Sequence, residues 1–279
     1  MKKYITLAAL LAAGTACANA VDAGNTLLIT FGSNDGAGVT TGTGSFLEVA
    51  GMTYNIVSTS GAGGWTTGQD ALKYANNTVA TGITFSTSQA VSGANGKVTT
   101  ITDSDKVGDV FDTNMMSAVI NYQDPNTSAG GFTSTFSGLT DGKTYEIYAF
   151  AGRGNDYGGV AETDTNTYSI SSGAKSGSIK AEIIDYTVST AGRPNPSVNG
   201  DTITAYTQSN DNENQTCENW VLMKYTFTAG GDTVEFTASG NGCGNLGAIA
   251  LVNVPEPSAF GMLAGLGALA LVASRRRRK

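Results

Sequence analysis

The sequence predicts an all-β protein, a single β-sandwich of jelly-roll type that spans residues 21–253. Three observations support this fold class. Apolar and polar residues alternate with a period of two in many short segments that are rich in threonine, valine and isoleucine. Glycine and asparagine mark turns between these segments at intervals of about 10–15 residues. No repeat of 20–50 residues is evident, which argues against a propeller or a solenoid.

The strands follow one another along the whole body. In the first half we expect them at 26–31, 46–57 with a break at Gly51, 78–85, 97–102, 132–136 and 144–150. Within 105–122, apolar residues at helical spacing predict a short helix, followed by a strand at 118–122. In the second half we expect strands at 167–171, 178–188, 202–207, 220–228, 233–238 and 247–254. Gly230-Gly231-Asp232 predicts a hairpin turn, and Arg193-Pro194-Asn195-Pro196 a loop.

Residues 1–20 have the three parts of a secretory signal peptide. Two lysines form a positive start, Ile5–Ala13 an apolar core, and Ala18-Asn19-Ala20 a small-residue cleavage site. We therefore expect export and a mature chain that begins at Val21. The apolar core is too short for a membrane span, which needs about 20 residues. Cys17 permits a lipoprotein interpretation, but the leucine expected three residues before a lipidated cysteine is absent.

Residues 254–279 form a second targeting segment. It consists of the Pro-Glu-Pro motif Val254-Pro255-Glu256-Pro257, an apolar helix at about 258–274, and the basic end Arg275-Arg276-Arg277-Arg278-Lys279. At about 1.5 Å per residue, the helix is close to the length that spans a bilayer core of about 30 Å. The cationic end is expected to stay in the cytoplasm, which places the body on the far side of the inner membrane.

The order of a Pro-Glu-Pro motif, a short apolar segment and a basic end closely resembles the PEP-CTERM sorting signal. This signal is also catalogued as the ice-binding-protein C-terminal domain. The resemblance implies a transient membrane anchor, processing near Pro255-Glu256-Pro257 by an exosortase-type enzyme, and delivery to the cell surface or extracellular matrix. It does not imply ice binding, because the sequence shows no regularly spaced threonine array. A plain single-pass tail that is retained is the alternative.

The body is acidic and sparsely charged. The two terminal signals contain seven of the 16 basic residues and one of the 23 acidic residues, which leaves a formal charge of −13 on the body. This charge argues against a nucleic-acid partner. The chain has no histidine, which excludes Ser-His-Asp triads, Cys-His pairs and histidine-ligated metal sites.

Cys217 and Cys243 are the only cysteines of the expected mature chain. In an oxidising compartment, an isolated pair predicts a structural disulfide. A closed loop of about 27 residues would stabilise the fold by roughly 3–4 kcal/mol. Trp220, in a strand beside Cys217, is expected to lie in the core.

Two oxygen-rich segments are candidates for calcium. Asp103, Asp105 and Asp109 stand at positions 1, 3 and 7 of a loop that has glycine at position 6. This loop departs from the EF-hand pattern at its fifth and twelfth positions. Asp211 and Glu213 belong to a second segment, 210–214. A solvated acidic turn is the simpler explanation of each segment, so no cofactor is predicted and calcium is kept as an alternative.

Two loops carry side chains suited to contact with glycans. Arg153, Asn155, Asp156 and Tyr157 supply a forked donor, an amide, a carboxylate and an aromatic ring between glycines. Trp65 lies in a second glycine-rich loop. Aromatic rings can stack on sugar rings, and the polar groups can bind sugar hydroxyls. Ordinary turns are the alternative at both places.

The run 136–148 resembles the turn-into-strand element of galactose-binding-like jelly rolls and fibronectin-type sandwiches. In those folds a glycine-leucine pair, here Gly138-Leu139, fills the core before a strand that carries tyrosine. The resemblance implies a sandwich and transfers no binding residue.

These features predict a non-enzymatic surface or matrix protein that binds carbohydrate or exopolysaccharide. A structural or adhesive protein without a small-molecule site is the alternative. A glycosidase is a third interpretation, since Glu48 and Glu146 lie in apolar strands. However, Glu146 is expected to point to solvent, and no pattern pairs the two carboxylates.

Overall fold

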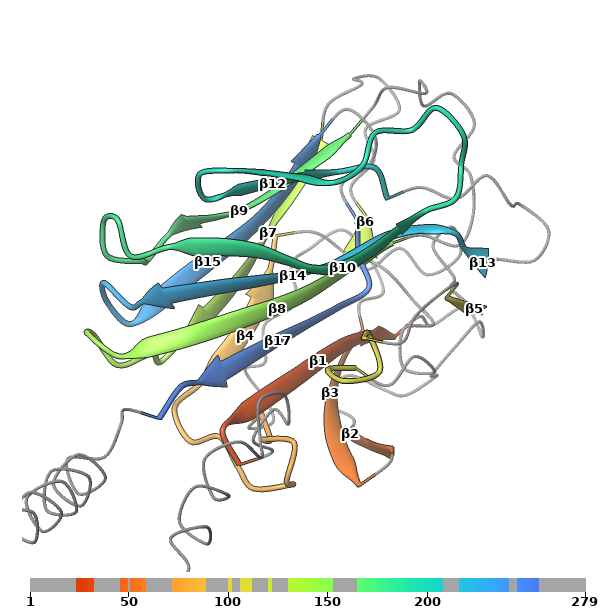
Figure 1. The fold of residues 1–279 in the computed structure, drawn as a ribbon. Helices are drawn as coiled ribbons and strands as arrows, with labels where there is room; N and C mark the ends of the chain where they lie inside the picture. Colours follow the sequence, from red (N-terminus) through yellow and green to blue (C-terminus); the bar gives the residue numbers. More distant parts are fainter. Residues whose placement is uncertain are drawn as a thin grey trace, which may run out of the picture.

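The structure, a computed structural model, describes residues 24–32, 46–49, 51–58, 72–88, 100–101, 106–111, 120–121, 130–152, 165–207, 216–240 and 245–255. These residues form two β-sheets that pack face to face (Figure 1). The predicted all-β sandwich is therefore confirmed. Within the described ranges, no helix has the length and apolar character needed to cross a membrane. The predicted signal peptide and C-terminal helix lie outside these ranges.

The first sheet has seven strands in the order β10-β14-β8-β17-β1-β3-β2. Their bounds are β1 Thr26–Gly32, β2 Phe46–Val49, β3 Met52–Ser58, β8 Thr144–Gly152, β10 Lys180–Val188, β14 Asn219–Thr228 and β17 Ala248–Asn253. All of its neighbouring strands are antiparallel except β1 and β3. Gly51, with φ +79°, makes the predicted break between β2 and β3.

The second sheet has six antiparallel strands in the order β11-β12-β9-β15-β7-β4. Their bounds are β4 Thr84–Thr87, β7 Gly130–Ser137, β9 Asn166–Ser172, β11 Ser197–Asn199, β12 Thr202–Ala205 and β15 Thr233–Gly240. Four short strands form two small pairs, β5 Thr100–Ile101 with β13 Thr216–Cys217, and β6 Ile120–Asn121 with β16 Asn245–Leu246.

From β7 onward, successive long strands alternate between the two sheets. The turns 138–143, 173–179 and 229–232 each carry the chain from one sheet to the other (Figure 1). The predicted hairpin at Gly230-Gly231-Asp232 is therefore wrong, because β14 pairs with β8 and β10 whereas β15 pairs with β7 and β9. Backbone hydrogen bonds instead join the connections to one another, as between the Gly230 amide and the Gly173 carbonyl, at 2.8 Å.

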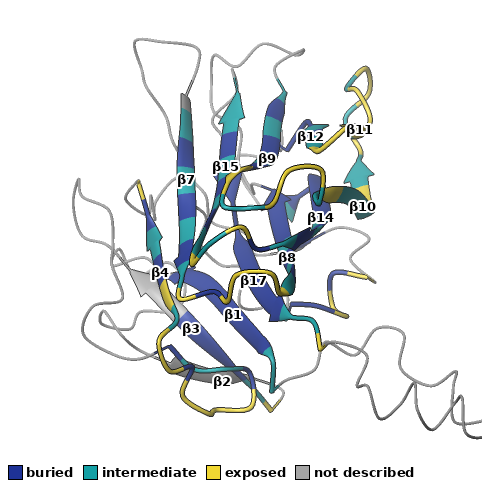
Figure 2. Ribbon diagram, turned by 90° about the vertical axis from the view of Figure 1, so that its left-hand side faces the viewer, coloured by how far each residue is buried: buried dark blue, intermediate teal, exposed yellow. Residues whose placement is uncertain are grey.

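The main core lies between the two sheets, where the inward positions of the long strands are buried and most of them are apolar (Figure 2). Phe236 on β15 packs against Tyr168 on β9 and Tyr225 on β14, with ring centroids 6.3 and 5.6 Å apart. Leu139 is buried in this core, as the resemblance of run 136–148 implies. The Tyr145 hydroxyl accepts a hydrogen bond from the Thr140 amide at 3.0 Å, which holds the turn against its strand.

A second core covers one part of the outer face of the first sheet. Trp220 is fully buried there, as predicted, and packs on Phe150 with ring centroids 5.8 Å apart. Val107 and Phe111 lie over the same cluster and are also fully buried. Residues 106–111 form turns with local hydrogen bonds rather than the predicted helix. The remainder of the predicted helical stretch lies outside the described residues.

Hydroxyl side chains cover the outer face of the second sheet. On β15, Thr233, Thr237 and Ser239 alternate with buried residues, and the outward positions of β7, β9 and β12 carry only threonine, serine or glycine. Hydroxyls pair across strands, as between Thr237 and Ser171 at 2.7 Å. The sequence alone does not predict this array of hydroxyls, because the side chains that lie next to one another belong to strands that are far apart in the chain. Glu235 is the only charged side chain on the outward positions of these described strands.

Two other expectations need correction. The strand predicted at 78–85 begins only at Thr84, because turns at 75–76 and 81–82 flank Val79, which makes only an isolated bridge with Lys73. The segment after the predicted loop 193–196 contains a short, exposed edge strand, β11, that was not expected. Its pairing with β12, rather than its own alternation, makes it a strand.

Candidate functional site

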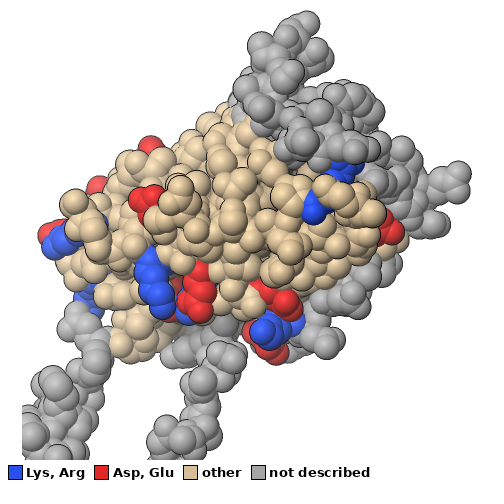
Figure 3. All heavy atoms as spheres, turned by 45° about the horizontal axis from the view of Figure 1, so that its top comes forward, with Lys and Arg blue, Asp and Glu red and all other residues tan. Residues whose placement is uncertain are grey.

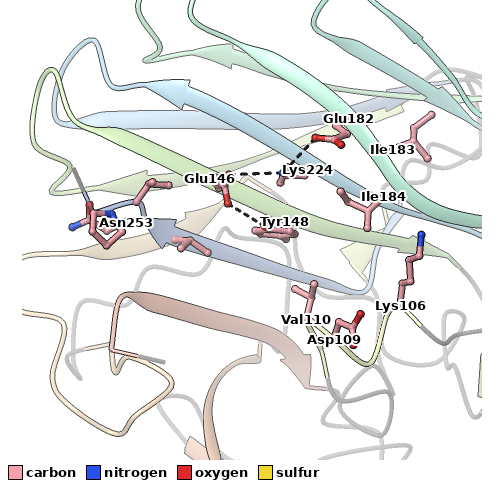
Figure 4. A pocket seen from close by; sticks show the side chains of 13 residues that line it. Lys106, Asp109, Val110, Glu146, Tyr148, Glu182, Ile183, Ile184, Lys224 and Asn253 are labelled. Carbon is pink, nitrogen blue, oxygen red and sulfur yellow. Dashed lines mark hydrogen bonds and ion pairs between the residues drawn. The ribbon is translucent and has the colours of Figure 1, made fainter. Parts of the chain in front are cut away.

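A groove of about 520 Å³ lies on the outer face of the first sheet, beside the second core (Figure 4). Side chains of β8, β10 and β14 form its floor, while the turn at 106–110 and the end of β17 lie at its edges. The lining residues are Lys106, Asp109, Val110, Glu146, Tyr148, Glu182, Ile183, Ile184, Lys224, Val252, Asn253, Val254 and Pro255. The groove is therefore assembled from five segments that are far apart in the sequence.

Strand register brings the charged residues of the floor together. Lys224 on β14 lies opposite Glu182 on β10 and opposite Tyr148 on β8. Its ammonium group is 3.3 Å from the Glu182 carboxylate and 3.9 Å from that of Glu146. The side chains of Lys224 and Glu146 are only about one fifth exposed, at 22% and 21%. One cation thus joins two carboxylates in a partly buried setting.

Glu146 is surrounded by donors on both of its oxygens. The Tyr148 hydroxyl donates to Oε2 at 3.0 Å, and the Thr226 hydroxyl donates to Oε1 at 3.3 Å. Burial, together with the nearby Glu146 carboxylate, raises the pKa of Tyr148 well above its usual range. Glu146 faces out from the sandwich as predicted, but it lies within a network rather than in open solvent.

The outline of the groove follows from the packing of its edges. At one edge, Val107 and Val110 are buried in the second core, and they hold the exposed Lys106 and Asp109 beside the sheet (Figure 4). On β10, the extra residue of a bulge between Ile183 and Asp185 turns Ile184 toward this outer face. Tyr148 packs against the same cluster. The apolar residues of the second core therefore hold the polar side chains of the groove in position.

Exchanging Lys224 for methionine is expected to lower the free energy of unfolding by about 1–2 kcal/mol, because two partly buried carboxylates would lose their shared cation. Lys175→Met is the matched control, since its pair with Asp141 is 3.5 Å long and much more exposed, at 48% and 67%. That control should cost less than about 0.5 kcal/mol. Urea unfolding of the mature proteins measures both changes, and equal losses would contradict the network.

The end of β17 forms the other edge of the groove and leads into the C-terminal segment. The Val254 amide donates to the Thr144 carbonyl at 3.2 Å, and the exposed Pro255 follows. The PEP-CTERM protein-sorting motif matches residues 253–278. This chain carries a PEP-CTERM sorting signal. The signal indicates an exported protein that an exosortase processes and sorts to the cell surface.

The PEP-CTERM match covers only the end of the chain, so it identifies the sorting signal and leaves the body unassigned. No curated protein and no solved structure gives a significant match. The resemblance of the body to galactose-binding-like jelly rolls is accordingly not confirmed.

Most predicted site residues lie outside the described residues. This holds for all five predicted glycan contacts, Trp65, Arg153, Asn155, Asp156 and Tyr157, and for four calcium candidates, Asp103, Asp105, Asp211 and Glu213. Asp109 is described and lies exposed at the edge of the groove. Among the described residues, no cluster of three or more acidic or cysteine side chains could hold a metal ion.

The predicted disulfide stays a prediction, because Cys243 lies outside the described residues. Cys217 is fully buried on β13, with its sulfur 3.6 Å from the Asn219 carbonyl oxygen. It also lies close to Gly152, where a Cβ atom would come within 2.5 Å of the sulfur. The Cys217 sulfur is thus part of the packed end of the first sheet.

Figure 3 shows charged side chains in small groups, separated by wide uncharged areas of the surface. The groove contains five of them, Lys106, Asp109, Glu146, Glu182 and Lys224. Of these residues, the sequence pointed only to Glu146 and Asp109. In parts of β8 and β14, polar residues alternate with buried ones. This alternation is the sequence signal that places Glu146 and Lys224 on the outer face.

Proposed function

We propose that the body is a non-enzymatic binding module that holds carbohydrate, such as an exopolysaccharide chain, in the groove of the first sheet. The protein would reach the cell surface or the extracellular matrix after its sorting signal is processed. Before that step, the C-terminal helix would anchor it in the inner membrane, with the body outside the cytoplasm.

The observation that carries this proposal is the set of groups in the groove. Glu146 and Glu182 offer charged acceptors, Lys224 offers a charged donor, and Tyr148 offers a ring edge beside them. Charge-assisted hydrogen bonds are among the strongest contacts available to hydroxyl-rich ligands. The volume of about 520 Å³ lies within the range of small-molecule sites. The loop residues Trp65 and Tyr157 are further candidates for glycan contact.

The same contacts favour binding over catalysis. A glycosidase needs two carboxyl groups, one of which carries a proton to give to the leaving group. In the groove, Lys224 pairs with both carboxylates, and two hydroxyls already donate to Glu146. Both carboxylates are thus already engaged as acceptors of ion pairs or hydrogen bonds.

A structural or adhesive matrix role is the second candidate, and the hydroxyl-covered face of the second sheet favours it. That face is broad, and it is uncharged apart from Glu235 on the described strands. Such a surface can contact hydrated polymers over a wide area without a defined pocket. The groove and this face are on opposite sides of the sandwich, so their roles can be tested separately.

Mature protein is recovered from a bacterium that contains the exosortase. It should bind glycans on an array or the exopolysaccharide of that bacterium. Tyr148→Ala should weaken binding at least tenfold, because it removes the ring and a donor to Glu146. Lys175→Met changes a charge that does not line the groove and should bind normally. Trp65→Ala and Tyr157→Ala test the loops in the same assay.

A folded protein that binds none of these polysaccharides would refute the binding module and leave the structural role. Binding that is lost only in the loop variants would move the site away from the groove. Release of reducing sugars from a bound polysaccharide would show the glycosidase interpretation instead.

A further inference from the structure

The sorting motif begins inside the folded body. The matched residues start at Asn253, which is still the last residue of β17. The Asn253 amide donates to the Asn25 carbonyl at 2.9 Å, and the Val254 amide donates to the Thr144 carbonyl at 3.2 Å. Two hydrogen bonds to neighbouring segments therefore hold the first residues of the motif. The chain has no spacer between its last strand and the Pro-Glu-Pro sequence.

This lack of a spacer limits how far the motif can move from the body. Pro255 is exposed just beyond the end of β17, and Glu256 and Pro257 follow it directly. Two extended residues span at most about 7 Å. An enzyme that binds the Pro-Glu-Pro sequence must therefore approach to contact distance of the body.

The surface that such an enzyme meets is the charged groove. Val254 and Pro255 line it together with Glu146 and Lys224, and Asn253 lies at the same edge (Figure 4). Glu182, on the far side of Lys224, is 42% exposed and available to a partner.

We propose that this groove is a docking surface for the exosortase, which would recognise the Pro-Glu-Pro sequence and the adjacent folded surface together. Alternating acidic and basic groups on the body would meet a complementary pattern on the enzyme. Such patterns set specificity and the rate of encounter more than the affinity. The docking would precede the binding function proposed above and does not depend on it.

Steric hindrance of the exosortase by the folded body is the alternative to docking on the groove. A spacer between the body and the Pro-Glu-Pro sequence distinguishes these two effects. Insertion of Gly-Ser-Gly-Ser between Asn253 and Val254 keeps the Val254-Pro255-Glu256-Pro257 sequence intact but moves it away from the groove. If the groove docks the enzyme, tail removal should become at least threefold slower in a bacterium that contains the exosortase. If the body only obstructs the enzyme, removal should become faster. Pulse-chase labelling of the full chain, with the loss of tail mass as the signal, measures this rate.

Charge reversal tests the groove itself without moving the motif. Glu182→Lys should slow tail removal at least threefold, because it reverses the exposed acidic end of the network. Glu235→Lys makes the same change on the opposite face of the sandwich and should keep the wild-type rate. The thermal unfolding midpoint of each mature variant shows whether the body remains folded.

Wild-type rates in both the spacer variant and Glu182→Lys would overturn the proposal. The rate of tail loss in a host without the exosortase gives the background that is subtracted from each measured rate. Glycan binding is measured on mature protein, so a failure there leaves the processing result unaffected.

Discussion

Alanine in place of Gly173 is expected to lower the free energy of unfolding by roughly 4 kcal/mol, among the largest losses from a single substitution. Gly173 follows β9 with φ +86°, a conformation that residues with a Cβ atom rarely adopt. A Cβ atom there would overlap the Thr233 carbonyl and lie 2.6 Å from the Val234 Cα atom. Both neighbours are backbone atoms of β15, the neighbour of β9 in the second sheet, so relief of the overlap would push the end of β9 away from β15.

Gly177 gives the matched control for this prediction. It lies in the same connection with φ +69°, but a Cβ atom there would meet nothing within 4 Å. Gly177→Ala should therefore cost only the backbone strain, about 1–2 kcal/mol. Chemical denaturation of the two mature variants compares them directly. Equal losses would mean that the positive φ alone matters and that the contact between the connection and β15 does not.

The same connections show where prediction from sequence ends. The alternation in β8 and β14 predicts which residues face the core, because every second side chain of a strand points the same way. It does not tell which sheet a strand joins. Gly230-Gly231-Asp232 has the composition of a hairpin, yet the chain changes sheet there because β15 pairs with β7 and β9. Long-range pairing decides the topology, and tight turns of similar composition serve both purposes.

The site was harder to predict than the strands, for a related reason. Glu146, Glu182 and Lys224 are each an ordinary polar residue on the outward side of a strand. They become a network only because β8, β14 and β10 are neighbours in the sheet. The sorting motif, by contrast, lies in one continuous stretch and was recognised from the sequence alone. The sequence therefore specified the destination of the protein but not the surface beside its motif.

Alkaline pH is expected to unfold this protein through two tyrosines of the main core. The Tyr225 hydroxyl donates to the Tyr168 carbonyl at 2.7 Å, and the Tyr168 hydroxyl donates to the Asn245 carbonyl at 3.3 Å. Both rings are fully buried. Burial raises the pKa of both hydroxyls far above the value of about 10 found in unfolded chains.

The direction of the pH effect follows from proton release. Below about pH 10, both tyrosines are protonated in the folded and unfolded chains, and their full contribution to stability is present. Above that pH, the unfolded chain loses these protons while the folded chain keeps them, so stability falls. Each tyrosine contributes a slope of about 1.4 kcal/mol per pH unit, or about 2.8 kcal/mol for the pair. Denaturant unfolding measured at intervals from pH 9 to 11.5 should show this slope.

Tyr225→Phe separates the contribution of one hydroxyl from the general effect of alkali. The variant should be less stable at pH 8 by about 1–2 kcal/mol, because the buried Tyr168 carbonyl loses a donor. Above pH 10 its stability should fall with a slope about 1.4 kcal/mol per pH unit smaller than that of the wild type. Tyr186→Phe removes a hydroxyl from a residue that is 41% exposed and serves as the control. An unchanged slope in Tyr225→Phe would show that the Tyr225 hydroxyl becomes accessible to alkali before the two sheets separate.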